Sequence, residues 1–161
     1  MKKIDLVDSQ HLEDWNVNFP NLTVLCLQDM RSRSVSAILH LVRKQLRHLT
    51  MEEMKLEINN MTIDLPNLQE FHLKDVKGKS TITSLLQVPG PNLKQLKLIN
   101  LHLEGRRIYP RFDELEELAV EGNINVSLNT LLKIPGTSLK RLIIKNNHLV
   151  NESKPCWKQG K

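Results

Sequence analysis

The sequence predicts an α/β solenoid, in which stacked repeat units form a concave parallel β-sheet and short helices and turns lie on the convex side. Three observations support this fold class. A six-residue leucine pattern recurs seven times in 161 residues, and its spacing alternates between short and long intervals. Aromatic residues make up only 4% of a chain that is 40% hydrophobic, so aliphatic side chains must form the core. The length suits one domain.

The repeated core has the form L-x-x-L-x-L, with hydrophobic residues at its first, fourth and sixth positions. It begins at residues 1, 22, 46, 68, 93, 115 and 139, which predicts about seven units over residues 1–150 and a polar tail over residues 151–161. One core is too short to bury its leucines alone, so neighbouring units must stack and share an interior. Parallel neighbours need a crossover, which places the connecting segments on the opposite face of the sheet.

The units that begin at residues 22, 68 and 115 are long, and each contains a second apolar run that predicts a short helix. These runs cover residues 36–42, 81–86 and 127–132. Serine or threonine begins each run and Pro-Gly ends the last two, which is typical of helix boundaries. The shorter units return through irregular segments rich in Asn, Arg and Pro, and Pro-Asn precedes the core at residues 20–21 and 66–67.

With these cores, the chain resembles leucine-rich repeat proteins over residues 1 to about 150. That family usually places Asn or Cys at the ninth position of each unit, and this chain departs from the pattern. Its ninth residues are Ser9, Met30, Met54, Val76, Leu101, Asn123 and Asn147. Irregular spacing, Pro-Asn before the core and scarce cysteine are similar to the repeat region of F-box/leucine-rich repeat proteins. The resemblance implies a binding scaffold and, more narrowly, the substrate-recognition part of a ubiquitin-ligase receptor.

Cysteine usage and the start of the chain predict a cytoplasmic or nuclear protein. The chain holds two cysteines, Cys26 and Cys156, which are too few and too far apart for a disulfide framework. The first ten residues lack the apolar region of a signal peptide, and no apolar stretch is long enough for a transmembrane helix. Sequons at residues 21, 60, 125 and 151 leave an extracellular recognition domain as an alternative.

The third, fifth, seventh and eighth residues of each unit should point outward on the concave face. Over the seven units these positions carry nine acidic and five basic residues, although the whole chain has a net charge of +5. An acidic face favours a protein or peptide partner with a basic patch and disfavours nucleic acid. The alternative is that the charges only solvate the sheet. The predicted partner-binding residues are Asp29, His48, Thr50, Glu52, Glu53, Glu70, His72, Lys74, Gln95 and Lys97.

The sequence predicts neither a metal site nor a catalytic site, and no cofactor. His48, His72 and Cys26 share the predicted face, but zinc requires ligands that converge, whereas a regular sheet displays its side chains in parallel. A Cys–His pair also needs an orienting group and a pocket. We therefore expect a non-catalytic interaction module. Because neither terminal unit carries a polar cap, the alternative is a structural segment or remnant of a longer repeat protein, which packs or self-associates through its open ends.

Overall fold

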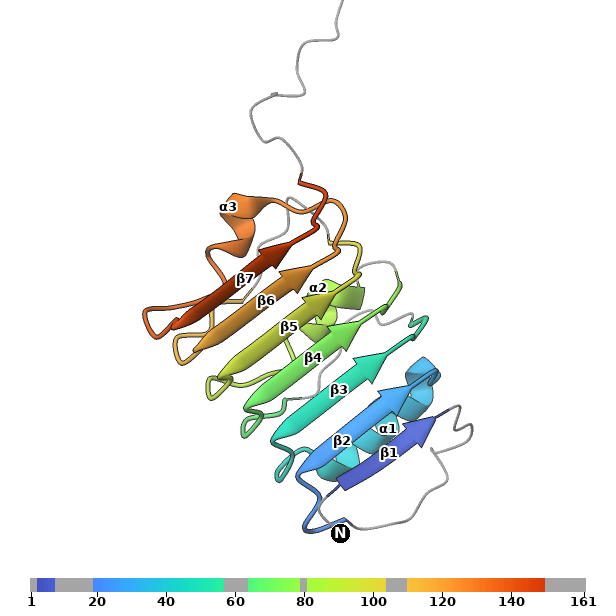
Figure 1. Cartoon of the computed structure of the whole chain (residues 1–161). Helices are drawn as coiled ribbons and strands as arrows, with labels where there is room; N and C mark the ends of the chain where they lie inside the picture. Colours follow the sequence, from blue (N-terminus) through green and yellow to red (C-terminus); the bar gives the residue numbers. More distant parts are fainter. Residues whose placement is uncertain (1–2, 8–18, 57–63, 79–80, 104–109, 150–161) are drawn as a thin grey trace, which may run out of the picture.

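The computed structural model describes residues 3–7, 19–56, 64–78, 81–103 and 110–149. It contains one sheet of seven parallel strands, arranged in the order of the sequence from β1 to β7 (Figure 1). The predicted tail over residues 151–161 lies outside the described residues. The strands are β1 Lys3–Val7, β2 Val24–Gln28, β3 His48–Glu52, β4 Glu70–Lys74, β5 Gln95–Ile99, β6 Glu117–Glu121 and β7 Arg141–Lys145.

Each strand covers the third to seventh positions of a predicted unit, and the register pairs equivalent positions of neighbouring units. Leu25 is paired with Leu49, for example, and Leu27 with Met51. The fourth and sixth positions are buried in strands β2 to β6, whereas the third, fifth and seventh are mostly half-buried. This alternation follows from the two-residue period of a strand. The third, fifth and seventh positions form what we call the outer sheet face.

Helices α1 Ser32–Val42, α2 Thr81–Leu85 and α3 Leu128–Leu131 confirm the three helices predicted in the long units. Helices α1 and α2 lie behind the sheet in Figure 1, on the side opposite the outer sheet face. The Ser127 side chain caps α3 by accepting a hydrogen bond from the Thr130 N–H at 3.2 Å. Helix α1 begins four residues before the predicted run, after Arg31, which makes no side-chain capping bond.

Among the described residues, the core is a single cluster of mostly aliphatic side chains, with Phe71 and Phe112, between the sheet and the connecting segments. Leu25, Leu49, Phe71, Leu96 and Leu118, at the fourth positions, are each no more than 1% exposed. Helix α1 contributes its own apolar face to the same cluster. The α/β class with a parallel sheet is therefore as predicted.

The two Pro-Gly sequences pack closely against the preceding short unit. Gly90 N donates to Leu65 O at 3.1 Å, and Leu65 N donates to Val88 O at 2.9 Å. A Cβ atom on Gly90 would lie 2.6 Å from the Cα of Pro66, which leaves room for glycine only. The same arrangement recurs one pair of units later around Phe112, Ile134 and Gly136. Pro-Gly therefore ends the helical segment and also permits close contact between units.

The described ninth positions fall into two groups with different roles, and Ser9 lies outside the described residues. Met30, Met54, Val76 and Leu101 are buried in the core. Asn123 is fully buried, and its side chain accepts from Leu101 N at 2.8 Å and donates to Leu98 O at 2.8 Å. Asn147 repeats the second contact by donating to Val120 O at 2.7 Å. A side-chain ladder of asparagines therefore exists at the C-terminal end of the sheet, where the sequence placed Asn at the ninth position.

The last strand differs from the inner strands in its exposure. Leu142 and Ile144, at the fourth and sixth positions of β7, are 42% and 37% exposed, whereas Leu118 and Val120 of β6 are fully buried. The apolar face of β7 therefore forms an open end of the core. Over the residues that the structure describes, no helix is both long and apolar enough to span a membrane.

Candidate functional site

Eight of the ten predicted partner-binding residues lie together on three adjacent strands, β3 to β5. The register aligns them in three rows that run across the strands. His48, Glu70 and Gln95 form the first row, and Thr50, His72 and Lys97 the second. Glu52 and Lys74 form the third row. We call these eight residues the central grid: His48, Thr50, Glu52, Glu70, His72, Lys74, Gln95 and Lys97.

Two pairs of polar neighbours within the central grid are close to one another. His48 Nδ1 lies 3.0 Å from Glu70 Oε2, and Lys74 Nζ lies 3.8 Å from Glu52 Oε2. These side chains are about one-third to two-fifths exposed. Half-exposed pairs of this kind contribute at most about 1 kcal/mol each. A partner could therefore replace either contact with its own charged groups at little cost.

His72 occupies the middle of the grid and differs from its neighbours in two respects. Its Nε2 is the only buried side-chain nitrogen or oxygen without a hydrogen-bond partner among the described residues. Burial lowers the pKa of the imidazole, and the nearby Lys97 ammonium lowers it further. The ring is therefore neutral at pH 7. An unpaired buried nitrogen costs free energy, which a shift of the ring that exposed Nε2 to a donor would recover.

The other two predicted residues, Asp29 and Glu53, lie one position beyond the ends of their strands. Both have a positive φ, 52° and 53°, and so do Asp75, Asn100 and Asn146 at the same position of other units. Asn, Asp and Gly tolerate this left-handed conformation best. The backbone at the eighth position, where the chain leaves each strand, therefore needs a residue that adopts a positive φ. The Glu53 carboxylate also accepts a hydrogen bond from Gln28 Nε2 at 3.2 Å.

Because the eighth positions lie beyond the strands, the predicted acidic charge does not lie on the strands. On the strands themselves, the outward third, fifth and seventh positions carry five acidic and five basic residues, so the outer sheet face is balanced. The acidic excess comes from the eighth positions, where the chain leaves each strand. It therefore lies along the carboxyl-terminal edge of the sheet, and the described residues that supply it are Asp29, Glu53 and Asp75.

Cys26 lies beside Thr50 on the outer sheet face and two strands from His72, as the sequence predicted. Burial raises the pKa of its thiol, and a hydrogen bond to the Asp5 carboxylate raises it further. Lys3 Nζ in turn lies 3.2 Å from Asp5 Oδ2. A raised pKa opposes formation of the reactive thiolate. Within the described ranges, no group of three or more His, Cys, Asp or Glu side chains could hold a metal ion.

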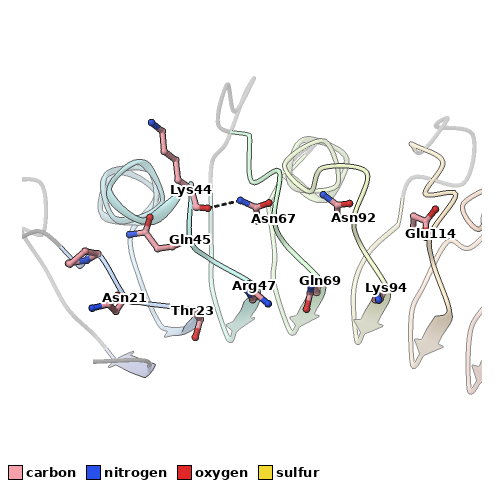
Figure 2. Close-up of a pocket in the computed structure, with 11 residues that line it drawn as sticks. Asn21, Thr23, Lys44, Gln45, Arg47, Asn67, Gln69, Asn92, Lys94 and Glu114 are labelled. Carbon is pink, nitrogen blue, oxygen red and sulfur yellow. Dashed lines mark hydrogen bonds between the residues drawn. The ribbon is translucent and has the colours of Figure 1, made fainter.

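The sequence reasoning missed a groove that crosses the starts of the strands. Its volume is about 1090 Å³, and Figure 2 shows its side chains. Two asparagines that precede their cores help to build it: Asn67 Nδ2 donates to Lys44 O at 2.7 Å and Asn92 Nδ2 to Pro66 O at 2.8 Å. The Pro-Asn motif was a signal for this feature. The lining residues are Pro20, Asn21, Thr23, Lys44, Gln45, Arg47, Asn67, Gln69, Asn92, Lys94 and Glu114.

Comparison of the chain with family models, with curated proteins and with solved structures found no significant match.

Proposed function

We propose that the chain is a leucine-rich repeat module that binds a protein or peptide partner without catalysis, through the outer sheet face of β2 to β5. The seven-stranded parallel sheet and its regular register support this proposal, because such a sheet offers one broad surface, with α1 and α2 on its other side (Figure 1). Fold alone does not define function, so the proposal depends on the chemistry of the central grid.

The observation that carries the proposal is the position of His72. A neutral imidazole with an unpaired Nε2 lies at the centre of polar side chains that come from three strands. Because this nitrogen is itself closed to solvent, a peptide amide or hydroxyl could satisfy it only after the ring or its neighbours shift, whereas the half-buried side chains around it are directly accessible. The pairs around it, His48 with Glu70 and Lys74 with Glu52, supply hydrogen-bonding and charged groups that a partner can match.

The acidic edge gives the partner a preferred orientation. Asp29, Glu53 and Asp75 attract a basic patch, while the balanced grid provides directional hydrogen bonds. Long-range attraction of this kind raises the association rate and selects the partner more than it raises affinity. We expect a partner with basic residues beside a polar, hydrogen-bonding surface. The narrower role, substrate recognition for a ubiquitin ligase in the cytoplasm or nucleus, rests on the sequence resemblance.

Affinity capture from native lysate tests the proposal with a pair of matched variants. The face variant combines Glu70→Arg with His72→Ala. The control combines Asp64→Arg with His102→Ala, two exposed positions outside the grid that undergo the same chemical changes. We expect a protein that is retained by wild type and control but lost from the face variant. Identical captures by all three proteins, each with the wild-type melting temperature, would refute the proposal. The identity of the captured protein would test the ubiquitin-ligase role.

A second function is favoured by the open end at β7, whose apolar residues would pack against a further repeat unit of the same kind. Leu142 and Ile144 are in register with the buried Leu118 and Val120, so an added strand would continue the existing core. Asn147 occupies the ladder position at this end. A further repeat unit fits this end, because leucines at its own fourth and sixth positions would cover Leu142 and Ile144.

Sedimentation equilibrium tests this second function. If the open end mediates assembly, the apparent mass of the chain rises with concentration, and Ile144→Lys abolishes that rise. Leu41→Lys is a matched control, because Leu41 on α1 is 38% exposed and Ile144 is 37% exposed. A constant monomer mass for wild type up to high micromolar concentration would exclude assembly of the chain through this end.

A further inference from the structure

The groove at the starts of the strands, which we call the strand-start groove, differs in position and charge from the outer sheet face. Arg47, Gln69 and Lys94 lie in one row at its base, each directly before the first residue of β3, β4 or β5 (Figure 2). Its lining includes three cations, Lys44, Arg47 and Lys94, and one anion, Glu114. The groove is therefore basic, whereas Asp29, Glu53 and Asp75 lie at the opposite edge of the sheet.

Side chains, and not the backbone, must carry recognition in this groove. The carbonyl oxygens of Arg47, Gln69 and Lys94 each accept two backbone N–H groups from the next unit, at 2.7–3.0 Å. These carbonyl groups are already paired, so a bound peptide cannot form β-sheet hydrogen bonds with them in the groove. The Asn67 and Asn92 amides are held by hydrogen bonds to backbone carbonyls. Fixed amides beside cations are suited to the peptide groups and carboxylates of a protein segment.

The composition of the groove favours a peptide over a nucleic acid. None of its lining residues is aromatic, so it offers no platform on which bases could stack. Three cations opposed by one carboxylate are also few for a phosphate backbone, whose binding strength depends on the number of neutralised charges. Five side-chain amides line the groove, namely Asn21, Gln45, Asn67, Gln69 and Asn92.

The spacing of the cations predicts the spacing of the acidic groups in the ligand. Arg47 and Lys94 belong to units two strands apart, which corresponds to about 9.5 Å at the usual separation of strands. A polyproline II segment repeats the same face every three residues, or about 9.3 Å. Carboxylates three residues apart in such a segment could therefore reach both cations.

We propose that the strand-start groove binds an extended, acidic protein segment whose carboxylates are spaced three residues apart. This inference does not depend on the proposed role of the outer sheet face, because the two surfaces share no residue. Arg47 and Lys94 form the charge contacts, and the amide side chains between them contact the backbone of the segment. Asp29, Glu53 and Asp75, at the carboxyl-terminal edge of the sheet, repel the same acidic segment. The segment therefore binds at the edge where the strands start.

Fluorescence anisotropy with a labelled peptide of four Glu-Pro-Pro repeats tests the inference in low-salt buffer. We expect saturable binding by wild type and a loss of affinity of about tenfold or more in the double variant Arg47→Glu, Lys94→Glu. The control, Lys77→Glu with Lys133→Glu, has the same net charge but changes exposed lysines outside the groove. Its affinity should stay within about twofold of wild type. Circular dichroism confirms that each variant folds.

Three results would each overturn the inference. The first is the absence of saturable peptide binding by wild type up to millimolar peptide. The second is an equal loss of affinity in the groove variant and in the control, since the effect would then be one of net charge. The third is tighter binding of a twelve-nucleotide oligothymidylate than of the peptide, which would assign the groove to polyanions in general.

Discussion

Replacing Asn123 by alanine should destabilise the protein more than the loss of any exposed amide. The Asn123 side chain is fully buried and bonds two backbone groups of the preceding unit, Leu101 N and Leu98 O, both at 2.8 Å. Alanine can neither accept from Leu101 nor donate to Leu98. The substitution therefore leaves a buried N–H without an acceptor and removes the hydrogen bonds that Nδ2 donates to Leu98 O and, at 3.0 Å, to Asn147 Oδ1.

The magnitude follows from these losses. An unsatisfied buried N–H costs about 1–3 kcal/mol, and a lost hydrogen bond costs about 1 kcal/mol more. We expect the free energy of unfolding to fall by about 3 kcal/mol. With a denaturant slope of about 2 kcal/mol per molar urea, the unfolding midpoint should fall by about 1.5 M. Urea titration followed by far-ultraviolet circular dichroism measures this shift.

Two further variants separate hydrogen bonding from side-chain volume. Asn123→Leu imitates Leu101, the ninth residue of the preceding unit, and fills the space without replacing the hydrogen bonds. It should lose nearly as much stability as alanine. Asn92→Ala removes an exposed amide that donates to Pro66 O at 2.8 Å, and water can replace this contact, so we expect a loss below about 1 kcal/mol. The reasoning fails if Asn123→Leu is as stable as wild type, or if Asn123→Ala costs no more than Asn92→Ala.

Three other consequences can be measured directly. Gly90→Ala would place a Cβ 2.6 Å from the Cα of Pro66, so we expect a loss of about 1–3 kcal/mol; an unchanged melting temperature would contradict the close packing. His72 has a lowered pKa in the folded state, mainly through burial, so the unfolded chain binds a proton more readily. Stability should therefore fall as the pH drops below about 6.5, the ordinary pKa of histidine, and His72→Gln should remove that part of the dependence; an equal slope in both proteins would refute this. The Cys26 thiol should react slowly with iodoacetamide at pH 8, in a variant without the other cysteine, and Asp5→Asn should accelerate the reaction; no acceleration would exclude the Asp5 hydrogen bond as a cause.

Much of the architecture could be predicted from local patterns. The L-x-x-L-x-L spacing identified the inward residues of every strand, because side chains alternate between the two faces with a fixed period of two. The apolar runs located all three helices, although α1 begins earlier, at Ser32. Eight of the predicted site residues fall on adjacent strands because units of similar length repeat the same register.

Some features required the stacked structure. From the sequence, Asp29 and Glu53 were predicted to bind a partner. Their positive φ values show that they also form the turns by which the chain leaves β2 and β3. The strand-start groove could not be predicted from one unit, since its side chains come from units 21–25 residues apart and meet only after stacking.

The sequence alone determined which positions face inward, the parallel order of the strands and the location of the helices, because these depend on residues within one or two units. The tertiary structure alone decided how deeply each polar group is buried and which charges meet. Burial of His72 depends on neighbours from three strands, and the separation of acidic and basic edges depends on how the turns at each end align. Solvation and electrostatic energies depend on distances in space, which the order of residues does not specify until the units are packed.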